Sequence, residues 1–158
     1  MLTSVHKTDQ TRTRIALSTV QQTIPPELHQ GLEILLSHCA DPSSALMRLE
    51  SFCERFPADF QQIAVTPFGL QSLIALFSSS EFLSEEVLQH PDWLLSILAS
   101  GWLHRARNTI EMQAELEGTL ATLDRTPLPL NLAEFRRRQL LRILLRDVHG
   151  FAALPEIT

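Results

Sequence analysis

The stretch 134-EFRRRQLLRILLRDV-148 sets five arginines among leucines, in a chain of 158 residues whose formal net charge is −5. At about 100° per residue, this spacing predicts an amphipathic helix with one apolar arc. The arc holds Leu140, Leu141, Leu144, Leu145 and Val148. A row of basic residues runs beside the arc at steps of four, namely Arg138, Arg142 and Arg146. Arg137 lies within the arc itself.

The row of arginines allows two interpretations. Arg138, Arg142 and Arg146 are a candidate interdomain contact, in which case the row should be at least partly exposed. Alternatively, they pair with Asp and Glu side chains on neighbouring helices of the same bundle. Arg137 is a candidate internal anchor, because a guanidinium inside an apolar arc must reach either the surface or a buried acceptor. Nucleic acid and membrane partners are not expected, because the chain is acidic and no aromatic residues interleave with the basic ones.

Helical spacing continues through most of the chain. Apolar side chains recur at steps of three and four from Leu28 to Cys39 and again from Leu70 to Phe77. Asp41 and Thr66 each precede a proline, which predicts an N-cap followed by proline at the first helical position. Tyrosine is absent and no stretch alternates apolar and polar residues over six positions, so strands are not expected.

Three further helix boundaries are predicted in the second half of the chain. Ser78 and Glu81 fit a capping box, in which each side chain satisfies a free N–H of the first turn. Pro91 begins a new helix, because its ring cannot continue the preceding turn. Asn131 and Glu134 are predicted to cap the arginine-rich helix.

These patterns predict an all-α fold, an irregular bundle of about six to eight helices, several of them short. Residues 1–24 are rich in Thr and Gln and are expected to form a mobile N-terminal arm, followed by a helical domain over 25–158. The predicted core consists of Leu49, Phe52, Leu73, Phe77, Leu94, Leu98, Leu141 and Leu144.

Patterns for catalysis, metals and membranes are not found. The six histidines lack the ligand spacing of zinc sites, and the five glycines are isolated, so no glycine-rich loop can cradle a phosphate. Cys39 and Cys53 occupy apolar helical positions and are expected to be free thiols, which suits a reducing cytoplasm. The longest apolar run, Leu73 to Phe77, is far shorter than the ~20 residues of a membrane helix. We therefore expect a cytoplasmic chain with no catalytic residue, metal or cofactor of its own.

Two segments together resemble a known family. They are 77-FSSSEFLSEEVLQHPDWL-94 and, some forty residues later, 132-LAEFRRRQLLRILLRDV-148. Both are similar to the N-terminal helical region of the glutamate–ammonia ligase (glutamine synthetase) adenylyltransferase and adenylyl-removing enzymes, over roughly Thr66 to Thr158. These are bifunctional enzymes that adenylylate and deadenylylate glutamine synthetase.

The resemblance implies an N-terminal, non-catalytic segment, truncated before a nucleotidyltransferase domain that it supports in adenylyl removal. That domain carries a Gly-Lys-Leu-Gly-Gly stretch and an Asp-x-Asp pair that binds magnesium, and no residue here matches either motif. ATP and Mg²⁺ are therefore implied only for the full-length family. The implied partners are the downstream domain of the same polypeptide, glutamine synthetase and a PII-type signalling protein. The alternative function is that of a free-standing helical adaptor that binds other proteins and has no enzymatic activity.

Overall fold

The computed structural model describes the backbone of residues 2–122 and 128–151, and within them the side chains of 9–121 and 129–151. These residues form nine α-helices and no strand, which confirms the predicted all-α class with slightly more helices than the six to eight expected. The helices are α1 Leu2–Thr23, α2 His29–Ser37, α3 Pro42–Arg55, α4 Pro57–Ala64, α5 Pro67–Ser79, α6 Glu81–Gln89, α7 Pro91–Ala99, α8 Thr109–Thr122 and α9 Leu128–Val148. Two short 3₁₀ turns are η1 Pro26–Leu28 and η2 Trp102–His104.

The chain divides into two compact units, Met1–Leu95 (unit 1) and Ser96–Thr158 (unit 2), with the boundary inside α7. The sequence predicted one helical domain over 25–158 and did not reveal this division. The boundary leaves no signal in the sequence, because the apolar residues of α7 continue across it without a change in composition.

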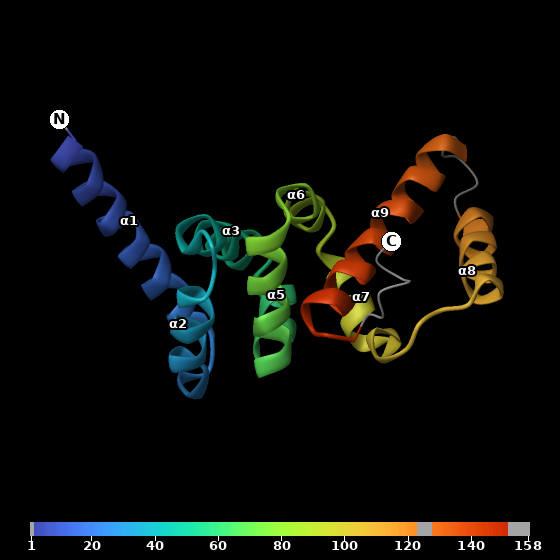
Figure 1. The fold of residues 1–158 in the computed structure, drawn as a ribbon, viewed down its shortest axis with the longest axis horizontal. Coiled ribbons are helices and arrows are strands. Elements are labelled where there is room, and N and C mark those ends of the chain that lie inside the picture. The colour runs from blue at the N-terminus through green and yellow to red at the C-terminus, as the bar shows by residue number, and fades with distance from the viewer. Residues whose placement is uncertain (1, 123–127, 152–158) are drawn as a thin grey trace. The chain divides into compact units, whose positions relative to one another are not determined.

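Unit 1 is organised around α3 and α5, which pack against each other (Figure 1). Helix α3 also contacts α1, α2, α4 and α6, and α5 also contacts α2, α4 and α6. The ring of Phe52 lies 6.0 Å from that of Phe77 and 6.4 Å from that of Phe60. All three side chains are fully buried, and aromatic pairs at these separations add to the stabilisation from buried area. The core of unit 1 therefore lies where α3, α4 and α5 meet.

Most of the predicted core is confirmed. The buried members are Leu49, Phe52, Leu73, Phe77, Leu94 and Leu141. Leu98 and Leu144 are half-buried instead. Both cysteines are free thiols, with Cys53 buried and Cys39 partly so.

Helix α1 differs from the loosely attached arm expected at residues 1–24. Ala16 and Val20 are fully buried and Ile24 is 5% exposed, and the helix packs against α3. Arg12 also donates a hydrogen bond of 2.9 Å to the buried carboxylate of Glu50 in α3. The Thr- and Gln-rich composition does not indicate this packing. Three small or medium apolar residues, four positions apart, are enough to pack one face of α1 against α3.

Two of the predicted caps are confirmed. The carboxylate of Asp41 accepts a hydrogen bond from the backbone N–H of Ser44 at 3.0 Å. The hydroxyl of Thr66 accepts one from the backbone N–H of Gly69, also at 3.0 Å. Helices α3, α4, α5 and α7 all begin with a proline. Proline suits this position because its missing N–H would have no intrahelical partner there.

The capping box predicted at Ser78 and Glu81 is wrong. Helix α5 continues to Ser79, and the N-cap of α6 is Ser80, whose hydroxyl accepts from the N–H of Leu83 at 3.2 Å. Ser78 instead donates its hydroxyl to the carbonyl of Ala75. Three consecutive serines left the choice of cap ambiguous in the sequence.

Replacing Ser80 should therefore destabilise the protein more than replacing Ser78. We expect Ser80→Ala to lower the free energy of unfolding by about 1 kcal/mol, because the first turn of α6 loses its side-chain acceptor. Ser78→Ala, the matched control, should change it by less than about 0.5 kcal/mol. Urea unfolding of the two variants measures the difference, and equal losses would contradict the assignment.

Unit 2 contains η2, α8 and α9, and α9 contacts both of the others. Helix α9 begins at Leu128, so Asn131 lies inside the helix and is not its cap, contrary to the prediction. Pro129 is compatible with the earlier start, because proline is tolerated in the first turn of a helix. Asn131 is 3% exposed.

Within the described part of the chain, no single helix is long and apolar enough to cross a membrane. Helices α4 and α5 satisfy those criteria together by length and composition, but they are bent by 117° at the break between them.

Candidate functional site

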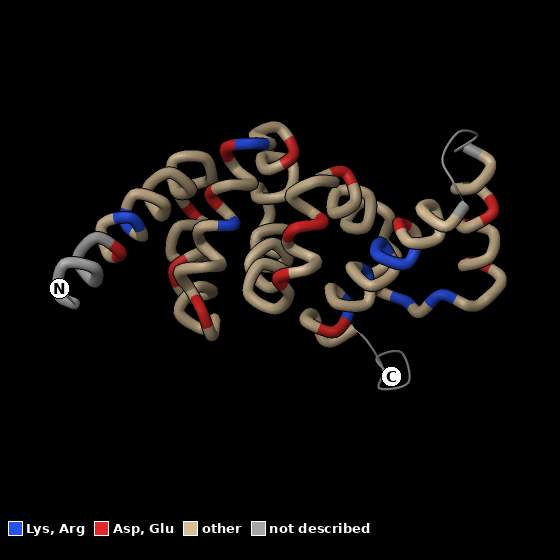
Figure 2. The backbone as a smooth tube through the Cα atoms, turned by 90° about the horizontal axis from the view of Figure 1, so that it is seen from above, with Lys and Arg blue, Asp and Glu red and all other residues tan. Residues whose placement is uncertain are grey.

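The arginine row of α9 lies on the buried side of the helix. Arg142 is 6% exposed and Arg146 is 3% exposed, whereas Leu140 of the predicted apolar arc is 40% exposed. Leu141 and Leu145, at the other edge of the arc, are buried. The buried face of α9 is thus rotated from the predicted arc toward the arginines, which Figure 2 marks in blue along this helix.

The two buried arginines donate to backbone carbonyls of unit 2. An Nη atom of Arg142 lies 3.0 Å from the carbonyl oxygen of Arg105 and 3.4 Å from that of Trp102. Arg146 donates to the carbonyl oxygens of Leu103 at 2.6 Å and of Phe151 at 2.9 Å. Carbonyls outside regular helices need donors when buried, and a charged donor makes a stronger hydrogen bond than a neutral one. The arginines therefore hold the segment 102–105 against α9.

The end of α9 brings one of these carbonyls into place. Gly150 has φ of +70°, a left-handed conformation that glycine adopts without strain. The backbone N–H of Phe151 then donates to the backbone carbonyl of Arg146 at 2.7 Å, and the N–H of Gly150 donates to the backbone carbonyl of Asp147 at 2.9 Å. These are the two hydrogen bonds of a Schellman motif. This turn carries the chain back so that the carbonyl of Phe151 meets the guanidinium of Arg146.

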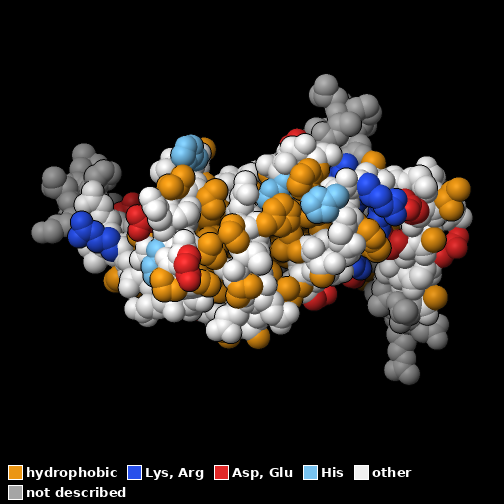
Figure 3. Space-filling model, turned by 90° about the horizontal axis from the view of Figure 1, so that it is seen from below, with side chains coloured by type: hydrophobic (Ala, Val, Ile, Leu, Met, Phe, Trp, Pro, Cys, Tyr) orange, Lys and Arg blue, Asp and Glu red, His pale blue; other side chains and the backbone are white. Residues whose placement is uncertain are grey.

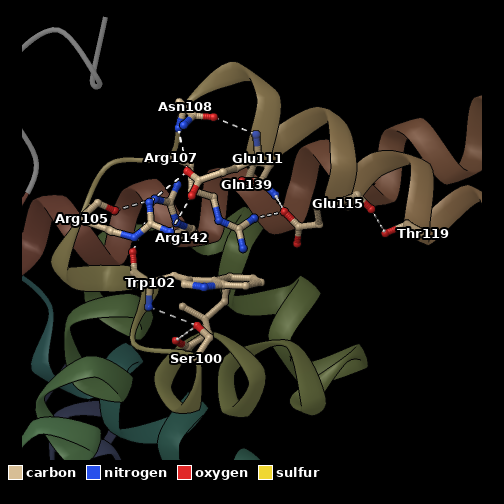
Figure 4. Close-up of polar contacts among 11 residues, drawn as sticks. Ser100, Trp102, Arg105, Arg107, Asn108, Glu111, Glu115, Thr119, Gln139 and Arg142 are labelled. Carbon is tan, nitrogen blue, oxygen red and sulfur yellow. Dashed lines mark hydrogen bonds and ion pairs between the residues drawn. The ribbon is translucent and has the colours of Figure 1, made fainter.

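A second group of side chains gathers around Trp102 (Figure 4). We call it the Trp102 cluster, and its members are Trp102, Arg105, Arg107, Asn108, Glu111, Glu115 and Gln139. The guanidinium carbon of Arg107 lies 3.2 Å from the centre of the Trp102 ring, and Arg107 forms an ion pair with Glu115. The same carboxylate accepts from the amide of Gln139 at 2.9 Å. The cluster thus joins the segment after η2 to both α8 and α9.

Arg107 is the most buried charged member, with a side chain that is 4% exposed. Burial, followed by repulsion from Arg142, lowers the pKa of Arg107 to about 10. The guanidinium therefore stays protonated at neutral pH and retains its ion pair with Glu115. The stacked indole and the carboxylate offset part of the cost of burying this charge.

Arg105, Asn108 and Glu111 organise the start of α8. Arg105 donates two hydrogen bonds to the carboxylate of Glu111, at 2.6 and 3.0 Å. Asn108 and Glu111 form a reciprocal capping box, with backbone-to-side-chain distances of 2.8 and 3.1 Å. The hydrogen bonds from Arg105, and then from the N–H of Asn108, hold the pKa of Glu111 below its ordinary value of 4.5.

Stability of unit 2 should consequently fall in acid. A carboxyl whose pKa is lower folded than unfolded stabilises the fold above pH ~4.5, and this contribution is lost as pH falls through the folded pKa. We expect Glu111→Gln to flatten the fall in stability below about pH 5, measured by urea unfolding across pH. A variant curve that runs parallel to that of the wild type would contradict this expectation.

A pocket of about 310 Å³ opens beside the cluster, lined by Trp102, Arg105, Arg107, Glu111, Ala114 and Glu115. Trp102 is 37% exposed there. Two arginines and two glutamates line the pocket and pair with each other, Arg105 with Glu111 and Arg107 with Glu115, and most of the exposed pocket surface is apolar. Figure 3 shows basic and acidic side chains next to each other on the surface. Tryptophan and arginine are enriched at contacts between proteins.

The predicted site residues are only partly brought together. Arg138 is half-buried and lines a small cleft with Arg107 and Arg142. The expected exposure of the row is wrong at Arg142 and Arg146, and the role of all three as an interdomain contact stays a prediction. Arg137 is half-buried, and its Nε atom donates to the carbonyl of Ala133 in the same helix at 3.3 Å. Its role as an internal anchor also stays a prediction.

Sequence reasoning missed Trp102, Arg107 and Glu115. The segment around Trp102 has no helical spacing, so nothing in it predicts contact with α9. One signal was available, because Asn108 followed three residues later by Glu111 is a capping-box pattern. It predicts the start of α8 but not the stack of Arg107 on Trp102.

Neither a group of metal ligands nor a glycine-rich phosphate loop occurs among the described residues. No three His, Cys, Asp or Glu side chains there come together as metal ligands. The two glycines with positive φ, Gly101 and Gly150, lie at separate turns, so they do not form a loop of consecutive N–H groups around a phosphate.

Comparison with known proteins relates residues 70–158 to the family model described as glutamate-ammonia ligase adenylyltransferase. Three curated relatives are described as bifunctional glutamine synthetase adenylyltransferase/adenylyl-removing enzymes. That of Shewanella loihica is 27% identical over 86% of this chain and 13% of its own length. That of Nitrosococcus oceani is 33% identical over 56% of this chain and 9% of its own length. That of Pseudomonas aeruginosa is 28% identical over 84% of this chain and 12% of its own length.

The chain therefore spans about an eighth of the length of the first of these relatives. No solved structure matches it significantly.

Proposed function

This chain belongs to the glutamate–ammonia ligase adenylyltransferase family, and from that premise we propose that it is the N-terminal, non-catalytic helical segment of a bifunctional enzyme that adenylylates and deadenylylates glutamine synthetase. In this proposal it supports the adenylyl-removing nucleotidyltransferase domain. The observation that carries the proposal is the family match over residues 70–158, which contains α6, α8, α9 and the Trp102 cluster.

The side chains in the matched region support a packing role. Arg107, Arg142 and Arg146 are engaged with a carboxylate or with backbone carbonyls of unit 2. The Gly-Lys-Leu-Gly-Gly and Asp-x-Asp motifs implied by the family resemblance do not occur in the 158 residues. We therefore assign ATP and Mg²⁺ to domains of the full-length enzyme outside this chain.

The proposed partners are the nucleotidyltransferase domain of the same polypeptide, glutamine synthetase as the target, and a PII-type signalling protein. Glutamine synthetase is taken from the names of the relatives, and the other two from the family resemblance. We place the protein in the cytoplasm, a reducing compartment that suits the free thiols of Cys39 and Cys53.

Titration calorimetry tests the proposal. The chain should bind the adenylyl-removing domain of the Pseudomonas aeruginosa relative, and titration with ATP and Mg²⁺ should give no specific heat. Arg138→Ala should weaken binding to that domain, whereas Arg55→Ala, an exposed arginine of α3 in unit 1, should leave it unchanged. Absence of binding to the domain, or specific binding of ATP, would contradict the proposal.

A further inference from the structure

Helix α9 carries an exposed, mainly apolar stripe on the side away from its buried arginines. We call it the outer stripe, and its members are Pro129, Leu132, Ala133, Arg136, Leu140, Ile143 and Asp147. Leu132 is 42% exposed and Leu140 is 40% exposed, and all the other members are exposed except Ile143, which is half-buried. At about 100° per residue, every member lies within about 60° of Arg136 around the helix axis. The stripe is about 27 Å long, at a rise of about 1.5 Å per residue.

An exposed apolar stripe of this kind, interrupted by Arg136, is unusual on the surface of a protein that acts alone. Single exposed leucines need no explanation, but exposed apolar residues that adjoin one another and are flanked by charge mark an interaction surface. A partner helix is the natural occupant, because regularly spaced apolar side chains on one helix pack between those of another.

The charges of the outer stripe show which partner fits. Arg136 and Asp147 form no ion pair with any residue that the structure describes. They cannot pair with each other, because eleven residues of helix separate them by about 16 Å. Eleven residues are also close to three full turns, so the two charges point from the same side of the helix. The stripe therefore presents one positive and one negative charge, with apolar residues between them.

We propose that the outer stripe binds the outer stripe of a second copy of this chain, as an antiparallel pair of α9 helices. With the two-fold axis at the level of residues 141 and 142, Arg136 faces Asp147 of the second copy, and Asp147 faces Arg136. The same axis places Leu140 against Ile143 of the second copy. Such an isologous contact joins identical surfaces, so the ion pair between Arg136 and Asp147 forms twice in the dimer.

The dimer should be weak. One pair of helices buries less area than the ~1,200–2,000 Å² of stable complexes, so a dissociation constant in the micromolar range or above is expected. The inference is independent of the proposed function, because it concerns the exposed side of α9 and needs no nucleotidyltransferase domain.

Sedimentation equilibrium over about 10 µM to 1 mM of the 158-residue chain tests the proposal. The wild type should dimerise, and Arg136→Asp and Asp147→Arg should each weaken the dimer at least ~10-fold, because each places like charges opposite each other. The combined variant, with both substitutions, should recover affinity to within about threefold of the wild type, since the charges are exchanged and the pairing is restored. Circular dichroism should show all three variants to be folded.

Two controls address the specificity of the effect. Arg55→Asp changes an exposed charge in unit 1 and should leave dimerisation unchanged. Leu140→Gln should weaken the dimer, whereas Ile110→Gln, at a position in α8 that is 79% exposed, should not. A chain that stays monomeric to about 1 mM would overturn the proposal, as would a dimer that the combined variant fails to restore.

Discussion

Substituting Gly69 with alanine should destabilise unit 1 by roughly 1–3 kcal/mol or more, although the change adds only one methyl group. A Cβ at this position would overlap the carbonyl oxygen of Ile63 and lie 2.8 Å from its carbonyl carbon. Both are backbone atoms at the end of α4, where the chain turns by 117° into α5. They cannot move aside without opening the contact between α4 and α5, which carry Phe60 and Phe77 into the core.

Gly31→Ala is the matched control for this change. Gly31 also lies in a helix of unit 1, but a Cβ there would meet nothing within 4 Å. Alanine favours the helix over glycine, so this variant should be about 0.5–1 kcal/mol more stable than the wild type. Urea unfolding followed by circular dichroism measures both. Equal effects of the two substitutions would show that helix propensity, and not the approach of α4 to α5, controls position 69.

Arg146→Met should destabilise unit 2 by about 3–5 kcal/mol. Methionine keeps most of the apolar stem but removes both hydrogen bonds to the carbonyls of Leu103 and Phe151. Hydrogen bonds to a charged group are worth about 1.5–3 kcal/mol each, and the buried hydrogen bond to the carbonyl oxygen of Leu103 is lost together with the part-buried one to that of Phe151. Thermal unfolding of the variant should therefore show a large decrease in midpoint.

Arg136→Met is the control on the same helix. Arg136 is exposed and has no ion pair among the described residues, so its replacement should change stability by less than about 0.5 kcal/mol. Measuring both variants at about 1 µM protein keeps association from contributing to the apparent stability. A loss at position 146 no greater than at position 136 would mean that the arginine row does not hold segment 102–105.

The helices of the first unit were largely predictable because their signals are local. Asp41 and Thr66 each combine a side-chain acceptor with a following proline, and the structure confirms both caps. The sequence does not distinguish Ser80 from Ser78 as the N-cap of α6, because either can cap and the choice depends on where α5 ends. The packing of α1 is weakly signalled in the sequence, because only a few apolar residues of this helix are buried.

The orientation of α9 was not predictable from its own sequence. Counting apolar residues places Leu140 inside and the arginines at the flank, but Leu140 is 40% exposed and Arg142 is buried. What reverses the expectation is the irregular segment after α7, whose carbonyls at Trp102, Leu103 and Arg105 require donors. An arginine can be a core residue when its donors are satisfied, and no pattern within α9 indicates where those acceptors lie.

The most direct test of the proposed role uses the adenylyl-removing nucleotidyltransferase domain of a relative, prepared without the N-terminal segment of that relative. The measurement is the rate at which this domain releases AMP from adenylylated glutamine synthetase. We predict that adding this chain raises that rate, in a saturable manner. A rate of AMP release that stays the same at every concentration of the folded chain would contradict the proposed role, because a segment that supports the domain must change the activity of that domain.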